Sequence, residues 1–327
     1  KLLETRRKLL DNLIDDYRTY FSKMVDLDNS ERQLVERANK FSAYVRERVL
    51  WVQNIPALGL QTARRLPEAL TDIAAPGEWT ETVRMLWEDM RRNPFLPFLL
   101  VVVAGMLLWT RRRLRRRISD ISDLLHSAAT DTFTYTVKTC LYTALIAAPV
   151  PLIMLYLGWR LTVAAQMVPG FTLSAGHAFV AAGAYYLVLS LLRGACMPDG
   201  LLEDHFRLSD RAVSGVRNQV RWFLPLMVAT AFLLVFTEWL GNEAWSESLG
   251  RVVFMVCMFG TSVFFAFVLQ PSGRFVHDLL RRHRGGWLER TRYLWYGIAV
   301  LAPVTLAVIA AFGYYYGAQR LARRFQL

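Results

Sequence analysis

The sequence lacks the cysteine and histidine patterns that build disulfide frameworks and metal centres. Its three cysteines, Cys140, Cys196 and Cys257, lie within or at the end of apolar runs, and none belongs to a C-x-x-C pair. We therefore interpret them as small buried apolar side chains. Glu203-Asp204-His205 could in principle hold a metal, but it lies beside arginines in a charged segment, and we interpret it as a solvated loop. We expect no bound metal and no cofactor.

Catalytic signatures are also missing. The chain has no G-x-S-x-G, Walker, G-x-G-x-x-G, H-E-x-x-H or EF-hand pattern, so we expect no enzyme activity. Its apolar runs contain no carboxylate near their middle, because Lys138, Arg193 and Glu238 all lie close to run ends. Ion-coupled carriers keep charged groups near the middle of the membrane, which argues against a coupled transporter. No run has the long glycine and alanine stripe of a water-filled pore helix, and we assign no pore-lining residue.

The chain is rich in apolar sequence that is kept apart from its charge. Its 327 residues are 54% hydrophobic and yet carry a formal net charge of +12. Long apolar runs alternate with arginine-rich connections, which is typical of a membrane protein and not of a nucleic-acid-binding one. We predict an all-α, polytopic α-helical membrane protein with an N-terminal periplasmic helical segment. The six predicted transmembrane helices are at about 95–110, 137–159, 177–197, 222–240, 252–270 and 294–317.

Six arginines in seven positions follow the first apolar run directly: Arg111, Arg112, Arg113, Arg115, Arg116 and Arg117. Arginine is always charged and cytoplasmic flanks are rich in it, so we predict that this arginine run is a cytoplasmic anchor that sets the topology. The connections before Trp222 and after Gln270 are also rich in arginine, whereas 161–176 and 241–250 contain no lysine or arginine. This alternation agrees with the positive-inside rule.

The tail departs from this rule, because Arg320, Arg323 and Arg324 fall on the outside if the sixth run crosses completely. An external amphipathic turn that leads to another helix would explain them, and so would a re-entrant sixth run. Tryptophans stand near the predicted membrane boundaries and predict interfacial aromatic belts. They are Trp79, Trp87, Trp159, Trp222 and Trp295.

Residues 1–94 precede the first run and are predicted to be an external helical segment with a membrane-surface helix; the resemblance described below makes this segment periplasmic. A heptad-like seam is formed by Leu10, Leu13, Tyr17, Tyr20, Met24 and Leu27. Ser30 and Gln33 fit a capping box and predict that a second helix begins there. Two tandem helices and one bent helix both fit, and we favour packing of this segment in a hairpin or bundle with other segments.

Two amphipathic segments flank the first run. The prolines between Pro56 and Pro76 predict an interrupted approach to the membrane. A short helix at 78–90 follows, suited to the outer membrane surface or to packing against neighbouring helices. After the arginine run, apolar residues recur at helical spacing from Ile118 to Ala128, which predicts a helix along the cytoplasmic face.

The helical segment ending in Glu47-Arg48-Val49-Leu50-Trp51-Val52, the proline-broken sequence after it, and the first run with its arginines resemble one known family. In this order they are similar to the large MscS-type mechanosensitive channels, the group of MscK and MscM, over essentially the whole chain. The resemblance implies a Gram-negative inner-membrane protein and a homoheptamer, and we expect membrane lipids as partners and no nucleic acid, because the arginines alternate with membrane spans.

The same resemblance implies a role. These residues would be the end of a periplasmic domain and the peripheral, tension-sensing helices of a channel that opens on hypo-osmotic shock. The family's pore helix lies C-terminal to this kind of region, so we expect 318–327 to begin the connection to it. The chain starts at Lys1 without Met, and we expect it to be a piece of a longer precursor. The alternative is a membrane carrier or an assembly scaffold whose external helices bind a partner.

Overall fold

The computed structural model describes residues 2–48, 59–127, 132–165, 170–198, 202, 208–280 and 286–326. The chain divides into two compact units, residues 1–52 and 53–327. All regular elements in the described ranges are helices, which confirms the predicted all-α fold. Residues 49–58 lie outside the described residues. They include the last four residues of the stretch from Glu47 to Val52 on which the resemblance partly rests.

The described part of the first unit is a single helix, α1 (Leu2–Arg48). It runs through Asp28-Asn29-Ser30 without interruption, so the helix start predicted at Ser30 is wrong. The Ser30 hydroxyl donates to the carbonyl of Asp26, four residues earlier, at 2.7 Å. A serine can make this bond inside a helix as well as cap a helix start, and the local pattern does not distinguish the two.

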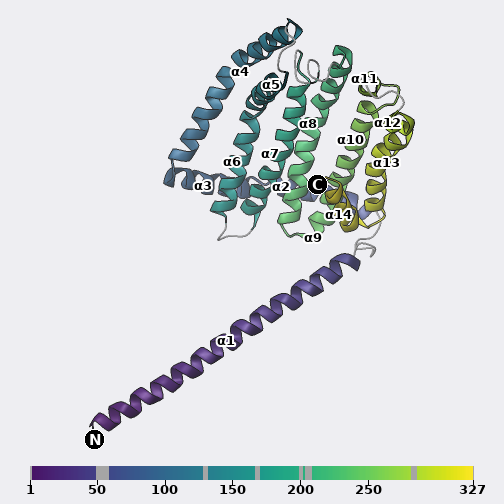
Figure 1. The fold of residues 1–327 in the computed structure, drawn as a ribbon. Helices are drawn as coiled ribbons and strands as arrows, with labels where there is room; N and C mark the ends of the chain where they lie inside the picture. Colours follow the sequence, from purple (N-terminus) through teal and green to yellow (C-terminus); the bar gives the residue numbers. More distant parts are fainter. Residues whose placement is uncertain are drawn as a thin grey trace. The chain divides into compact units, whose positions relative to one another are not determined.

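The second unit is a bundle of helices that stand side by side (Figure 1). Neighbours in the chain pack on each other from α6 to α8, α8 packs on α10, and α10 packs on α13. The helices are α2 (Leu60–Ile73), α3 (Pro76–Arg92), α4 (Phe95–Ser127), α5 (Thr132–Ala147), α6 (Pro149–Ala164), α7 (Phe171–Ala195), α8 (Asp210–Trp239), α9 (Glu243–Trp245), the π-helical turn η3 (Ser246–Gly250), α10 (Arg251–Val268), α11 (Arg274–Leu280), α12 (Trp287–Arg290), α13 (Arg292–Ala311) and α14 (Tyr315–Gln326).

In the part of the chain that the structure describes, five helical segments are long and apolar enough to cross a membrane: Phe95–Ile118, Phe171–Ala195, Asp210–Trp239, Ser246–Val268 and Arg292–Ala311. A sixth crossing is made if the bent pair Thr134–Ala147 and Pro149–Ala164 counts as one. These segments correspond in order to the six predicted runs. The sixth predicted run ends early, at Ala311, because a turn at Phe312 and Gly313 separates α13 from α14.

The run predicted at 137–159 is broken at Ala148, where α5 and α6 meet at an angle of 58°. Proline has no backbone N–H, so Pro149 and Pro151 cannot donate to the carbonyls of Leu145 and Ala147 four residues earlier. Ser190 of α7 donates from its hydroxyl to the Ala147 carbonyl at 3.4 Å. The proline pair therefore ends one helix and begins the next.

The helix predicted along the cytoplasmic face after the arginine run is the last part of α4 in the structure. It begins with no break after Arg117 and ends at Ser127. Arginine is a good helix former, so six of them do not stop a helix although they stop a membrane crossing. Ala128 lies outside the described residues.

Glycines let α6 and α7 approach closely. A Cβ on Gly158 of α6 would lie 2.6 Å from the backbone nitrogen of Val180, and one on Gly176 of α7 would lie 2.8 Å from Thr162 Cγ2. Helices in a membrane associate through close packing because lipid gives them no hydrophobic driving force, and small residues at the contact allow that packing. This contact fixes α6 against the core formed mainly by α7, α8, α10 and α13.

Candidate functional site

The bundle has two ends of different character. The end of α4 with its arginine run, and also α11 and α12, lie at one end, and α2, α3, α9 and α14 lie at the other (Figure 1). The described parts of the arginine-rich connections, at the start of α8 and in α11 and α12, are thus at the same end, called here the arginine end. The opposite end is called the α3 end.

At the arginine end, the predicted anchor residues are exposed on α4. Arg111 and Arg115, one turn apart, line a cavity of about 100 Å³ together with Arg193 of α7. Arg193 stands near the end of its run in the sequence, but no local pattern joins it to arginines so far away in the chain. The other residues of the arginine run do not line this cavity.

At the arginine end, hydrogen bonds join the start of α8 to α11. Ser209, which precedes α8, donates to Asp278 Oδ2 from its backbone N–H at 3.1 Å and from its hydroxyl at 2.5 Å. The bond from the Ser209 hydroxyl is the main reason that the pKa of Asp278 lies below its usual value. Nearby, burial raises the pKa of the Cys196 thiol to about 11. Cys196 and Cys257 are buried, as interpreted from the sequence, whereas Cys140 is exposed and the interpretation is wrong for it.

At the α3 end, a buried ion pair joins α3 to α6. Arg160 Nη2 and Nε lie 2.5 Å and 2.7 Å from Asp89 Oδ2. The Arg160 and Asp89 side chains are only 7% and 16% exposed. A second buried contact, a 3.0 Å hydrogen bond between the hydroxyls of Thr82 and Thr172, joins α3 to α7. Neither contact follows from the sequence, because α3 has the pattern of a surface helix whose polar residues face water.

The predicted interfacial tryptophans divide between the two ends. Trp79 of α3 is half-buried: its indole N–H donates to the Ile73 carbonyl at 2.6 Å and its ring packs edge-on against Phe171 at 5.0 Å. Trp87 and Trp159 are about half exposed and belong to the α3 end. Trp222 and Trp295 are half-buried near the starts of the apolar parts of α8 and α13, toward the arginine end. Trp79 is thus a packing residue as well as a candidate for the interfacial belt.

Helix α4 is the least buried of the candidate spans. Only 11% of its apolar window is buried within the chain, against 44% for α8. Among the described helices it packs mainly on α5 and α6. Large side chains such as Phe95, Phe98 and Trp109 are about 70% exposed, so this helix offers a wide apolar surface to whatever surrounds the chain.

The tail arginines lie on α14, an amphipathic helix at the α3 end (Figure 1). Arg323 forms an ion pair with Glu238 at the end of α8. Tyr315 is buried against Phe254, with ring centroids 5.7 Å apart. Burial is the main reason that the pKa of Tyr315 is raised, so its hydroxyl stays protonated. These contacts fix α14 to the bundle.

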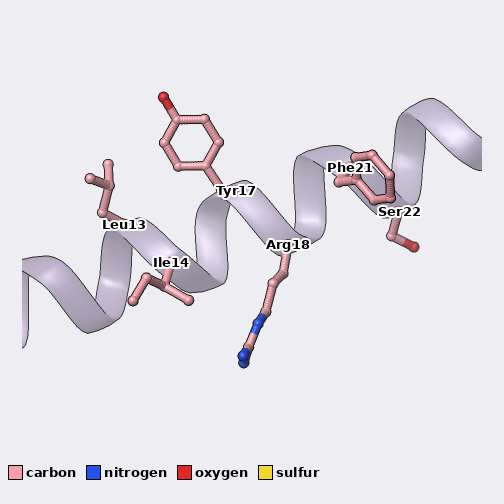
Figure 2. Close-up of a pocket in the computed structure, with 6 residues that line it drawn as sticks. All are labelled: Leu13, Ile14, Tyr17, Arg18, Phe21 and Ser22. Carbon is pink, nitrogen blue, oxygen red and sulfur yellow. The ribbon is translucent and has the colours of Figure 1, made fainter.

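The seam of α1 is exposed along the helix (Figure 2). The six labelled residues, from Leu13 to Ser22, all come from this helix, and Tyr17 and Arg18 point to different sides. The hollow that they line therefore has no second wall within the described part of unit 1. An apolar seam of this kind needs a partner surface to be buried.

Comparison with known proteins identifies the chain's relatives. The family model described as "Mechanosensitive ion channel inner membrane domain 1" matches residues 94–327. Two proteins of Escherichia coli (strain K12) are similar over 99% of this chain: the miniconductance mechanosensitive channel MscM, 22% identical, and the mechanosensitive channel MscK, 21% identical. An uncharacterized MscS family protein of Haemophilus influenzae (strain ATCC 51907 / DSM 11121 / KW20 / Rd) is 22% identical, also over 99% of this chain.

The chain spans 29% of the length of MscM and 28% of the length of each of the other two relatives. No solved structure matches. The family that matches is one of ion channels and not a class of enzymes. Because its model covers well over half of the chain, and because the resemblance found from the sequence leads to the same relatives, the chain belongs to the mechanosensitive ion channel family with the MscS-type inner membrane domain.

Proposed function

We propose that this chain is the peripheral, tension-sensing transmembrane region of a mechanosensitive ion channel that releases ions and small solutes on hypo-osmotic shock. The observation that carries the proposal is the family match over 94–327, together with the names of the relatives as mechanosensitive channels. The proposal places the chain in the inner membrane of a Gram-negative bacterium, within a homoheptamer, with α1 in the periplasm.

The exposure of α4 supports a sensing role. Its uncharged apolar part, Phe95–Thr110, spans about 24 Å at 1.5 Å per residue, which is shorter than the roughly 30 Å hydrocarbon core of a bilayer. A mismatch of this kind costs fractions of a kcal/mol per Å. Tension thins a bilayer, so it reduces the mismatch and favours the conformation in which α4 is most fully exposed to lipid.

The contacts of α3 supply a route from α4 to the bundle. Helix α3 leads into α4 through the short connection Asn93-Pro94, and it is held to α6 and α7 by the buried Arg160–Asp89 and Thr82–Thr172 contacts. A movement of α4 at the α3 end therefore pulls on helices in the core. The arginine run holds the other end of α4 at the cytoplasmic surface, because guanidinium groups do not enter the hydrocarbon.

Replacing the six arginines of the run by glutamine in the full-length protein tests this role. We expect a shifted tension threshold in patch recordings, because α4 can then slip along the membrane normal. A matched variant with six lysines keeps the charge and should keep the threshold close to that of the wild type. An unchanged threshold in the glutamine variant, with normal membrane insertion, would contradict the proposal.

The exposed seam of α1 favours one second candidate function, an assembly scaffold whose external helix binds a partner. At 47 residues, α1 is about 70 Å long, and its exposed seam is large enough to hold another helix. The two functions differ in one measurement. A channel protein gives tension-dependent conductance in excised patches, whereas a scaffold gives none and loses its partner when seam residues such as Leu13 and Tyr17 are replaced by glutamate.

A further inference from the structure

The cavity at the arginine end is lined by three arginines from two helices. Arg111 and Arg115 come from α4 and Arg193 comes from α7. The residues around the break at Ala148 line another side of the cavity. At about 100 Å³, the space is several times the roughly 10–15 Å³ that one water molecule needs, and it suits a small polyatomic group.

The positive charge of this cavity has no counter-charge in the part of the chain that the structure describes. None of the lining side chains is acidic. Among the ion pairs and hydrogen bonds of the described side chains, none involves Arg111, Arg115 or Arg193. Three like charges around one space repel each other, so an anion that enters it is stabilised by all three.

The donors in the cavity match an oxyanion. An arginine presents planar N–H groups that bind phosphate oxygens in pairs, and such charge-assisted bonds are the strong ones. Two hydroxyls, Ser190 and Tyr186, also line the cavity. The Ser190 hydroxyl lies 2.9 Å from the Leu187 carbonyl and 3.4 Å from the Ala147 carbonyl, so it would exchange these contacts to donate to an anion, and the arginines are the main donors.

An apolar groove adjoins the cavity. It has a volume of about 440 Å³, runs between α6, α7 and α8, and shares Tyr186 and Leu224 with the cavity. Its other walls are apolar side chains such as Met154, Val228 and Phe232. A cationic cavity beside an apolar groove is complementary to a phospholipid: the cavity matches its anionic phosphate and the groove matches its apolar chains.

We propose that Arg111, Arg115 and Arg193 form a phosphate-binding site at the membrane surface, occupied by the phosphate of a phospholipid whose acyl chain lies in the adjoining groove. Free phosphate shares the head-group chemistry but not the groove. The inference goes beyond the proposed channel function and does not depend on it, since it is tested by binding and not by conductance.

The test is the binding of phosphatidylglycerol to the detergent-solubilised chain, measured by native mass spectrometry. We expect Arg193→Gln to weaken binding about tenfold or more, because one charge-assisted hydrogen bond is lost. The double variant R111Q/R115Q should weaken it further. The matched control R112Q/R116Q removes the same charge at the same spacing on α4 but lies outside the cavity, and it should change binding by less than about threefold.

Competition with inorganic phosphate separates the two sources of the phosphate group. If millimolar phosphate does not displace the lipid, the head group and chain bind together as proposed. If phosphate binds with the same dependence on Arg193 and displaces the lipid, the anion site stands and the groove is not part of it. Arg193→Lys keeps the charge and should keep part of the affinity, and its unfolding midpoint checks that substitution at this position leaves the chain folded.

Two results would overturn the site. Equal loss of lipid binding in R111Q/R115Q and R112Q/R116Q would show that only the overall charge matters. Wild-type binding in a folded Arg193→Gln chain would show that α7 takes no part. Neither result bears on whether the full-length protein conducts under tension, so the site and the proposed function fail separately.

Discussion

Breaking the ion pair between Arg160 and Asp89 tests whether α3 is held to the bundle. Both side chains are more than four-fifths buried, so Asp89→Leu leaves a buried guanidinium without its partner. Removing one partner of a buried pair costs about 3–5 kcal/mol, whereas replacing both by apolar groups is often neutral. We therefore expect Asp89→Leu and Arg160→Met each to destabilise the chain by about 3 kcal/mol or more, and the double variant to recover most of that loss.

The assay is reversible unfolding of the detergent-solubilised chain, followed by tryptophan fluorescence and analysed as a double-mutant cycle. Arg84→Gln is the control on the same helix. It removes an ion pair with Glu88 whose side chains are 79% and 54% exposed, and pairs of this kind contribute about 0.3–0.5 kcal/mol. If the effects of the two single substitutions add in the double variant, the pair does not couple α3 to α6 and the route from α4 to the core is refuted.

Three further predictions concern packing, pH and reactivity. Gly158→Ala should destabilise the chain by about 1–3 kcal/mol because the added methyl overlaps α7, whereas Gly215→Ala on α8, with open space around it, should be neutral or stabilising in the same unfolding assay. The lowered pKa of Asp278 means that its bonds from Ser209 stabilise the chain at neutral pH and are lost only when the pH falls through the folded-state pKa, below 3.8. Asp278→Asn should therefore lower the unfolding midpoint at pH 7, and a difference that instead vanished between pH 7 and pH 5 would contradict the assignment. Cys196, with its pKa raised to about 11 by burial, should react with a maleimide only after unfolding, in a variant that lacks the other cysteines.

The architecture of the membrane unit follows from patterns that are local in the sequence. Apolar runs between arginine-rich connections predict helices that cross a membrane, and the structure has candidate spans in all six places if the bent pair counts as one. The amphipathic helix expected at 78–90 is α3, Pro76–Arg92. These features depend on composition over one or two dozen residues, which is the scale on which hydropathy acts.

Contacts between distant residues leave no such pattern. Asp89 reads as one of several charges on a surface helix, and only the fold places it against Arg160. Arg193 reads as a lone cation at a run end, and only the fold, which places it at the same cavity as Arg111 and Arg115, joins it to the arginine run. The helix start predicted at Ser30 failed for a related reason: the choice between an N-cap and a bond inside the helix depends on neighbouring turns, and α1 continues through it.

The break at Ala148 has a mechanical consequence. A helix in lipid resists bending because a lost backbone hydrogen bond finds no water to replace it. Here the bonds to the carbonyls of Leu145 and Ala147 are already absent, since Pro149 and Pro151 have no N–H to donate. The 58° angle between α5 and α6 can therefore open or close without breaking those main-chain bonds. The break therefore makes the α5–α6 pair easier to bend at Ala148 than elsewhere. The angle can change so that α5 follows the membrane surface while α6 remains packed on α7.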